Sequence, residues 1–279
     1  MDNLDVHIDP RIDAASTTSN DPILTYPTVV VHERYDISNP PPLPSPEWTR
    51  FVCISDTHTH TFPVPHGHVL LHGGDLTSTG KYDQMEKTME WLEELPHHHK
   101  IIIAGNHDLS LDNHDDWYIK NFHRWHSSKP EDVTCIRDLV KGERARNARV
   151  TYLEDEKFEF QTKPDGRTCL THGPPFQILD RTVGGDHVGC EALRARLPEL
   201  RPRVHVFGHI HEGHGALLQE WRSSGTPGDD AGNQGGCTVF VNAANWPMGD
   251  KARREAFAGR IPFGQGPFQP IIVDLFDTA

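Results

Sequence analysis

The chain has 279 residues, enough for one large domain with a sizeable core or for two small domains. Its formal charge of -13 at pH 7 argues against general binding to nucleic acid polymers or anionic membranes, because no basic field is available to release counterions. Five cysteines without a C-x-x-C pair, no leader pattern in the first thirty residues and no apolar run of membrane-spanning length predict a cytoplasmic protein with reduced thiols.

The first 48 residues are expected to lie outside the main domain. Residues 1–25 are polar and rich in Ser, Thr and Asp, so they are predicted to be a disordered tail. Residues 26–48 are predicted to contain a strand over 28–35 and a proline-rich connector over 38–48. The main domain is therefore predicted to span residues 49–279.

Short apolar runs alternate with helical patterns through this domain. The runs are rich in β-branched residues and bounded by Gly, Pro or Asp, as buried strands are, and they cover 51–54, 68–72, 100–104, 167–171, 204–208, 238–242 and 270–275. Helical patterns cover 82–95, 115–126, 131–141 and 189–200, and 223–236 has the composition of a flexible loop. This order predicts an α/β fold with either one mixed sheet or two stacked sheets.

Five of the predicted strands are followed directly by oxygen or imidazole donors. The donors are Asp56, His58, Asp75, Asn106, His172, His209 and His211. Glycine precedes the donor in three of the five segments, where the backbone must turn sharply or approach another group closely. Because ligand sites in open α/β sheets form where strand ends converge, these side chains are expected to share one crevice.

Seven donors are too many for a single ion. Two ions that share the Asp75 carboxylate would each receive four protein contacts. The mixture of imidazole and carboxylate suits Mn, Fe or Zn, and the absence of thiolate disfavours a structural zinc site. Turn and capping roles are the alternative for these residues, but turn chemistry does not explain five such segments in order.

The ordered segments D-x-H, G-D, G-N-H-D, H-G and G-H-x-H, between residues 52 and 212, resemble the calcineurin-like metallophosphoesterase superfamily. "GHVLLHGGDLT", "THGPP" and "GHIHEGHG" are more closely similar to its small metallophosphoesterase-domain-containing subfamily, which is related to class III cyclic-nucleotide phosphodiesterases. The resemblance implies a four-layer fold, with two stacked mixed β-sheets flanked by helices, and makes 49–279 a catalytic domain.

The resemblance also implies a role for each site residue. Metal one would take Asp56, His58, Asp75 and His211, and metal two would take Asp75, Asn106, His172 and His209. His107 would face the substrate and assist departure of the leaving oxygen, and Asp108 would accept a hydrogen bond from its ring. A hydroxide bridging the two metals would attack phosphorus in a small phosphate ester.

The expected activity is hydrolysis of a small phosphodiester such as a cyclic nucleotide. A phosphomonoesterase acting on a small metabolite is the first alternative, and a metal-poor scaffold of the same fold is the second. The segment after Asp75 lacks the arginine of the G-D-x-x-D-R-G motif of protein phosphatases, which disfavours a phosphoprotein substrate unless a residue such as Arg181 replaces it.

Several residues near these segments keep two readings. His60 is either a substrate contact or a polar loop residue, and Asn242 either braces the site or satisfies a turn. Trp246 is predicted to be a packing residue rather than a stacking platform. His97, His98 and His99 are predicted to form a solvated turn rather than a metal tract.

Overall fold

The computed structural model describes residues 23–112, 114–126, 129–156, 158, 167–221, 236–247 and 263–276. Most of the tail predicted for residues 1–25 and nearly all of the loop predicted for 223–236 lie outside the described residues. Among the described helices, none has both the length and the apolar character needed to cross a membrane.

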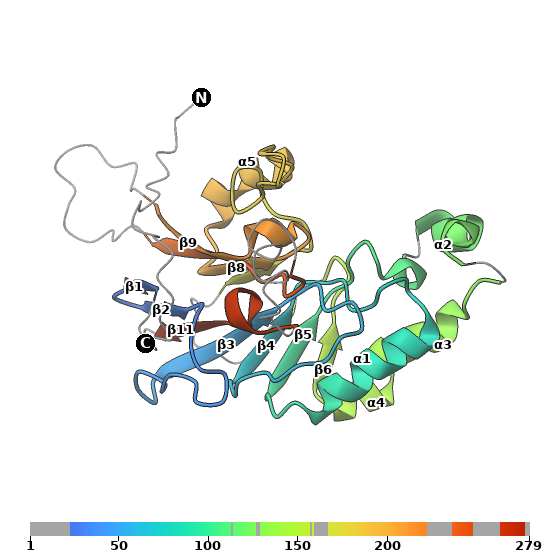
Figure 1. The fold of residues 1–279 in the computed structure, drawn as a ribbon, viewed down its shortest axis with the longest axis horizontal. Helices are drawn as coiled ribbons and strands as arrows, with labels where there is room; N and C mark the ends of the chain where they lie inside the picture. The colour runs from blue at the N-terminus through green and yellow to red at the C-terminus, as the bar shows by residue number, and fades with distance from the viewer. Residues whose placement is uncertain are drawn as a thin grey trace.

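Seven strands form the larger sheet, in the order β1-β2-β11-β3-β4-β5-β6 (Figure 1). They are β1 (Leu24–Tyr26), β2 (Val29–His32), β3 (Trp48–Ile54), β4 (Val69–His72), β5 (His99–Ile102), β6 (Val150–Tyr152) and β11 (Ile271–Phe276). The strands from β3 to β6 run parallel, whereas β11 pairs antiparallel with both β2 and β3. The sheet is therefore mixed, with a parallel half that ends on one edge.

Four strands form the smaller sheet, in the order β7-β8-β10-β9. They are β7 (Thr168–Leu170), β8 (Val204–Phe207), β10 (Cys237–Asn242) and β9 (Gly215–Glu220). β7, β8 and β10 run parallel, and β9 is an antiparallel edge strand. This sheet is stacked on the larger one, as the positions of β8 and β9 in Figure 1 show.

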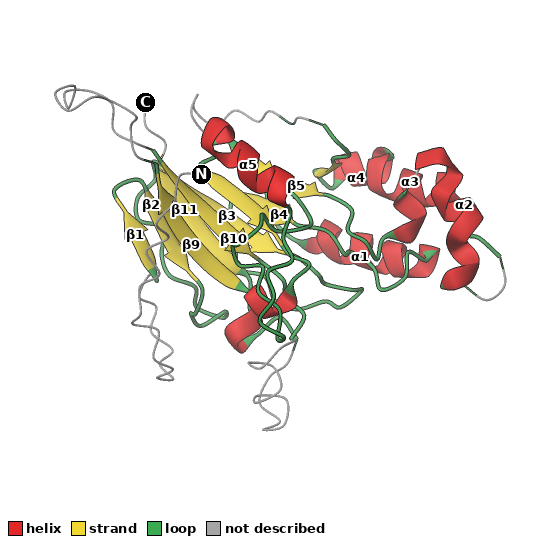
Figure 2. Ribbon diagram, turned by 90° about the horizontal axis from the view of Figure 1, so that it is seen from above, coloured by secondary structure: helices red, strands yellow, loops and turns green. Residues whose placement is uncertain are grey.

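The helices cover the outer faces of both sheets. They are α1 (Tyr82–Glu94), α2 (Trp117–Asn121), α3 (Val133–Lys141), α4 (Glu143–Asn147) and α5 (Glu191–Leu200). Single 3₁₀ turns are η1 (Leu109–Leu111), η2 (His114–Asp116), η3 (Phe122–Arg124), η4 (His211–Gly213) and η5 (Gly266–Phe268). Helices α1 to α4 gather at one end of the molecule (Figure 2).

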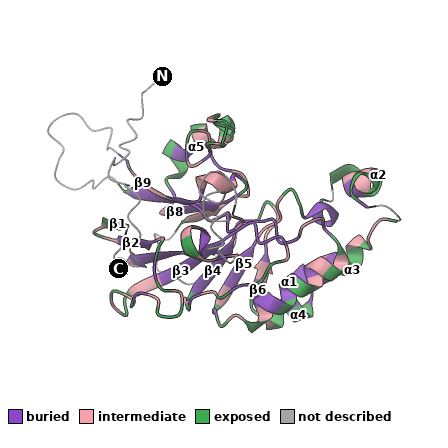
Figure 3. Ribbon diagram, viewed as in Figure 1, coloured by how far each residue is buried: buried purple, intermediate pink, exposed green. Residues whose placement is uncertain are grey.

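Alternation along β3 explains why the core has two faces. Val52 and Ile54 pack with Met85 and Met89 of α1, in the cluster between the larger sheet and its helices. Phe51 and Cys53 point the other way, into the cluster between the two sheets. Because both faces are covered, β4 is buried throughout and β3 is buried from Arg50 to Ile54 (Figure 3).

A third cluster completes the layers. Phe207 of β8 and Phe240 of β10 pack with Leu197 of α5 on the outer face of the smaller sheet. The order is helices, larger sheet, smaller sheet and α5, so the predicted four-layer fold is confirmed. Of the two architectures left open by the strand pattern, the stacked pair of sheets is the one observed.

The strand predictions agree with the structure to within a few residues at each end, but four elements were missed. β6, β9 and α4 were not predicted, and β1 occupies residues 24 and 25 of the expected tail. The prediction of a solvated turn at His97 is wrong, because this side chain is buried and lies 3.1 Å from the carbonyl oxygen of Pro65.

The two sheets are joined at the edge where β3 and β10 end. Ser55 and Ala244 form an isolated parallel bridge. The amide of Asn245 donates to the carbonyl of Ser55 at 2.9 Å, and the amide of Ser55 donates to Oδ1 of Asn245 at 3.2 Å. The residue after Ser55 is the first predicted ligand, so this junction fixes its position between the sheets.

Candidate metal centre

All seven predicted ligands follow the carboxyl ends of parallel strands. Asp56 and His58 follow β3, Asp75 follows β4, and Asn106 follows β5. His172 follows β7 of the smaller sheet, and His209 and His211 follow β8. The larger sheet thus supplies all three oxygen donors and one imidazole, and the smaller sheet supplies three imidazoles.

On one side of the site, Asp56, His58 and His211 offer ligand atoms that all lie within 4.8 Å of one another. Nε2 of His211 is 3.0 Å from Oδ1 of Asp56. Nε2 of His58 is 3.7 Å from Oδ2 of Asp75. These four residues are the set predicted for metal one.

On the other side, Asp56, Asp75 and His172 form a second group within the same distance. Nε2 of His172 lies 3.5 Å from Oδ1 of Asp75 and 2.9 Å from Oδ1 of Asn106. The ring of His209 is 5.0 Å from the ring of His172, measured between centroids. The set predicted for metal two is therefore also brought together, with Asp75 between the two sets.

The donor chemistry of this cluster fits metal ions. Asp56 and Asp75 are buried, and within the described part of the chain their ion pairs involve only histidine. Nδ1 of His172 lies 2.8 Å from the carbonyl oxygen of Gly73, which can only accept, so Nδ1 carries the proton and Nε2 faces the site. A backbone acceptor on the second ring nitrogen is the usual arrangement of a metal-binding histidine.

The backbone of the site is strained at the ligands themselves. Asp56, His58, Asp75 and His209 have φ between 45° and 66°, in the left-handed region that side chains other than glycine rarely adopt. Such strain persists where the surrounding structure enforces it, and it clusters at functional sites. Four of the seven predicted ligands share this conformation, which turn residues elsewhere in the described chain, such as Asp115 and Asp155, also adopt.

Glycines let the ligand segments approach each other. A Cβ at Gly105 would lie 2.3 Å from Oδ1 of Asp75, and a Cβ at Gly208 would lie 2.0 Å from Oδ2 of Asp56. At Gly74, φ is +100° and a Cβ would be 2.8 Å from Nδ1 of His172. These are the three glycines that precede ligands in the sequence, so the predicted close approach is observed.

The electrostatics show how the chain balances its buried carboxylates. Burial alone would raise the pKa of Asp56, but the hydrogen bond from His211 and the charge of His172 hold it below its usual range. Burial alone would lower the pKa of His172, but its hydrogen bond to Asp75 and the charge of that carboxylate raise it to about 9. Burial lowers the pKa of His58 to about 4. A bound cation would take over the role of the proton on His172.

The sequence match agrees with this geometry. A family model described as calcineurin-like phosphoesterase matches residues 49–213, which is more than half of the chain. The chain belongs to the calcineurin-like phosphoesterases. Membership makes it a metal-dependent phosphoester hydrolase, and it accounts for the order of the ligand segments along the chain.

Two similar proteins carry names from the same family. Metallophosphoesterase domain-containing protein 1 of Homo sapiens is 33% identical over 240 residues, which cover 71% of this chain and 67% of that protein. A UPF0046 protein of Caenorhabditis elegans is 30% identical over 257 residues, which cover 80% of this chain and 79% of that protein.

A third relative is much longer than this phosphoesterase. Probable rhamnogalacturonate lyase C of Emericella nidulans is 36% identical over 197 residues, which cover 62% of this chain and 18% of that protein. The chain thus spans about a fifth of the length of that relative. Most of the protein that bears the lyase name lies outside the match.

The role predicted for Asp108 in this phosphoesterase is corrected by the structure. Its carboxylate accepts hydrogen bonds from the amides of Leu76, Thr77 and Gly105 and from the hydroxyl of Thr77, at 2.7–3.0 Å. Asp108 therefore ties the segment after Asp75 to the segment before Asn106. The family resemblance implied that the His107 ring is its partner, whereas the carboxylate is turned inward toward backbone amides and the hydroxyl of Thr77.

The ring of His107 is held by a backbone carbonyl instead. Nδ1 of His107 donates to the carbonyl oxygen of Ser78 at 2.7 Å, which leaves Nε2 as the free nitrogen. The side chain is exposed at the rim, and it also satisfies the distance criterion for a ligand group with His58 and Asp75. Its role as a proton donor stays a prediction, which metal content of a variant can test.

Asn242 and Trp246 are now placed. Nδ2 of Asn242 donates to the carbonyls of Leu179 and Ile210, so it braces the segment between His209 and His211. The ring of Trp246 lies 5.0 Å from that of His58 and 6.5 Å from that of His211. Trp246 packs, as predicted, and its ring neighbours include two predicted ligands. Sequence reasoning could not indicate this contact, because Trp246 follows β10, a strand with no ligand motif.

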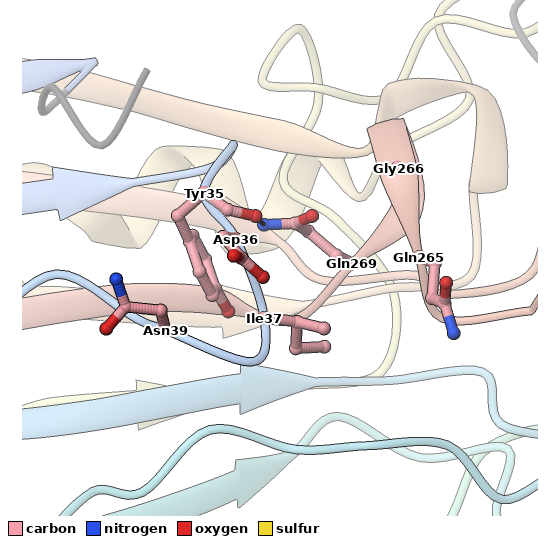
Figure 4. A pocket seen from close by; sticks show the side chains of 7 residues that line it. All are labelled: Tyr35, Asp36, Ile37, Asn39, Gln265, Gly266 and Gln269. Atoms are coloured by element: carbon pink, nitrogen blue, oxygen red, sulfur yellow. Dashed lines mark hydrogen bonds between the residues drawn. The ribbon is translucent and has the colours of Figure 1, made fainter. Parts of the chain in front are cut away.

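A separate hollow of about 470 Å³ lies elsewhere on the surface (Figure 4). Its lining comes from the segment after β2 and from the region of η5, namely Tyr35, Asp36, Ile37, Asn39, Gln265, Gly266 and Gln269. None of these is a predicted ligand.

Proposed function

We propose that this phosphoesterase hydrolyses a small phosphodiester, of which a cyclic nucleotide is an example, with two metal ions bound at the centre. The observation that carries the proposal is the position of Asp75. Its carboxylate lies 3.7 Å from Nε2 of His58 on one side and 3.5 Å from Nε2 of His172 on the other. A carboxylate between two imidazole groups is suited to bridging a pair of ions.

The proposed ions are Mn, Fe or Zn, since imidazole and carboxylate donors both suit these metals. When bound, they would supply Lewis-acid activation and neutralise the charge that develops on the phosphoryl oxygens. Asp56, His58, Asp75, Asn106, His172, His209 and His211 would hold them. The chain itself contributes the preorganised loops, because strain and close glycine contacts fix the ligands before any ion arrives.

His107 is proposed to handle the proton on the leaving oxygen. With Nδ1 fixed on Ser78, the Nε2 atom is the nitrogen that can donate to or accept from an ester oxygen. Its exposure at the rim places it on the solvent side of the buried Asp75 carboxylate. A small ester entering from solvent would meet this ring first.

Charge and thiol chemistry support a small substrate in the cytoplasm. The formal charge of -13 disfavours a nucleic acid polymer as partner. The segment after Asp75 also lacks the arginine of the protein phosphatase motif. The hydroxyl of Ser78, in that segment, donates to the carbonyl of His58 and so serves the loop instead. All five cysteines are free, which suits a reducing compartment.

The test begins with metal content. Protein reconstituted with Mn or Fe should hold about two ions per chain, as measured by elemental analysis. Fewer than one ion would contradict the dinuclear proposal and favour a metal-poor scaffold. Turnover of bis-p-nitrophenyl phosphate, p-nitrophenyl phosphate, and 2′,3′- and 3′,5′-cyclic nucleotides then separates a diesterase from a monoesterase.

The role of His107 is tested in the same assay. His107→Ala should lower kcat by about 10²–10⁴-fold while both ions stay bound. His98→Ala is the matched control, since His98 is an exposed histidine whose recorded partner is Arg149. Loss of an ion in His107→Ala would show that His107 is a ligand and would overturn its assignment as a proton donor.

A further inference from the structure

Trp246 forms an aromatic surface beside the metal ligands. Its ring lies 5.0 Å from the ring of His58 and 5.1 Å from that of His60, in edge-to-face geometry. It is also 5.4 Å from the ring of Phe263. The ligand cluster and this aromatic group are therefore in direct contact through one tryptophan.

The aromatic group continues outward from the site. The ring of His60 is stacked on that of Phe263, with centroids 4.4 Å apart and an interplanar angle of 20°. Exposure increases in the same direction, because His58 is buried, Trp246 and Phe263 are half-buried and His60 is exposed. Half-buried aromatic rings with this arrangement offer apolar surface to a planar group that arrives from solvent.

The carbonyl of His58 helps to fix this surface. Nδ1 of His60 lies 3.0 Å from that oxygen, so Nδ1 donates and the His60 ring is held against the ligand loop. Because Phe263 stacks on the fixed ring, the aromatic surface is positioned by the same loop that carries Asp56 and His58. A planar group bound on this aromatic surface would therefore lie at a fixed distance from the metal centre.

We infer that Trp246 is a specificity-determining residue that contacts the planar heteroaromatic ring of a nucleotide-like ester, with His60 and Phe263 beside it. This inference rests on the proposed phosphoesterase function and names its substrate class. Because the Trp246 ring lies 5.0 Å from the His58 ring, a nucleotide with its phosphoryl group at the ligands and its base on Trp246 would place its sugar between them. Every base can stack on an aromatic side chain, so we expect the site to prefer an ester that carries a base to one without a base, with little preference among bases.

The test compares AMP with ribose 5-phosphate, which share a phosphate and a sugar and differ by the base. Binding of each to the Mn-loaded chain is measured by calorimetry. In the unchanged protein AMP should bind more tightly than ribose 5-phosphate. Trp246→Ala should weaken AMP binding by about 10- to 100-fold and leave ribose 5-phosphate binding unchanged. Trp246→Phe should retain most of the preference.

Two controls make the result specific. Trp125→Ala truncates an exposed tryptophan directly after η3 whose ring contacts include Trp117 and Arg124, and it should leave both affinities unchanged. Manganese content of Trp246→Ala must match that of the unchanged protein, because Trp246 touches the His58 ring. A lower content that weakens both ligands equally would overturn the inference and make Trp246 a support for the ligands.

The outcomes separate this inference from the function beneath it. If ribose 5-phosphate and AMP bind equally to the unchanged protein, which also cleaves phosphate esters, the base contact is wrong and the phosphoesterase stands. If neither compound binds and no ester is cleaved with either Mn or Fe, the proposed function fails as well. For cleavage of a cyclic nucleotide, Trp246→Ala should raise KM with little change in kcat.

Discussion

Two groups of buried charges lie near the two ends of strand β3, and they differ in how their charges are neutralised. Near the start of the strand, Nε and Nη2 of Arg50 donate to the two oxygens of Asp274 at 2.7 and 2.6 Å, and Nη1 donates to the carbonyl of Pro41. Both side chains are almost fully buried. This pair is closed, because each charge meets its complement within the chain.

At the other end, Asp56 follows β3 and Asp75 follows the neighbouring β4; both are buried just as deeply, but they do not form a closed pair. Their ion-pair partners are histidines, and the proton that His172 retains through its raised pKa can balance only one of the two carboxylates. Burying a carboxylate without a full countercharge is costly, so the chain accepts a cost at this end that it avoids at the other. We infer from this difference that a bound cation completes the open cluster, whereas the closed pair only holds strands together.

The largest effect is expected from a substitution that disrupts the open cluster. Asp75→Asn removes the carboxylate between the two ligand sets, and it should lower phosphoesterase activity by about a thousandfold or more and reduce the number of bound ions. Elemental analysis and turnover of bis-p-nitrophenyl phosphate measure both effects. Asp83→Asn, at an exposed position of α1, is the matched control. Full metal content in Asp75→Asn would refute the bridging position.

The next largest effect is expected from a substitution that breaks the closed pair of Arg50 and Asp274. Arg50→Met leaves Asp274 buried without its partner and should lower the free energy of unfolding by about 3–5 kcal/mol. Turnover per folded molecule should stay unchanged, because the site lies at the other end of the strand. Urea denaturation measures the loss. Arg144→Met removes the exposed pair with Glu93 and should cost at most about 1 kcal/mol; equal losses in the two variants would erase the distinction.

A smaller effect tests whether the open cluster is preorganised. Gly105→Ala places a Cβ 2.3 Å from Oδ1 of Asp75, which forces the carboxylate to move, and should weaken metal affinity by about 10- to 100-fold. Gly173→Ala also alters a glycine beside a predicted ligand, yet its Cβ meets no atom within 4 Å. Competition with a chelator measures both affinities. A similar change in the two variants would mean that local packing does not position Asp75.

The smallest effect concerns a buried histidine that belongs to neither group. Burial lowers the pKa of His205 in β8 to about 3, and its Nδ1 atom has no hydrogen-bond partner. The unfolded chain takes up this proton first, since its pKa is about 6.5, so stability is lost as pH falls from about 6.5 toward 3. At pH 5 the loss should be about 2 kcal/mol relative to neutral pH.

His205→Gln provides the comparison for that pH dependence. The variant cannot take up a proton, so urea denaturation at pH 7 and pH 5 should show a smaller loss than in the unchanged protein. An identical loss in both proteins would show that His205 does not contribute. The difference between the two proteins removes every contribution to the pH dependence that does not come from His205.

Particular residues show how far sequence reasoning reached. The β-branched runs predicted eight strands, and the donors after them predicted which side chains would meet, because carboxyl ends of parallel strands share an edge. β6 and β9 escaped because Val150–Tyr152 is only three residues long and Gly215–Glu220 has no clean alternation. Sheet order also depends on pairings between distant segments, which composition does not record.

The inward turn of Asp108 and the contact between Trp246 and His58 were missed for a related reason. Both depend on how separate segments meet in space. Asp108 accepts from residues 31 and 32 positions earlier in the chain, and Trp246 lies 188 positions after the ligand whose ring it touches. Local spacing predicts which atoms can bind a metal, but it does not predict which neighbour fixes them.

The position of β11 has a consequence for the timing of assembly. This strand, residues 271–276, inserts between β2 and β3, although more than two hundred residues separate it from both along the chain. During synthesis the larger sheet therefore cannot close until these residues have left the ribosome. The ligand loops are complete by His211, yet the strand that carries Asp56 gains its second neighbour only later. We therefore expect the metal centre to become complete only after β11 has been synthesised.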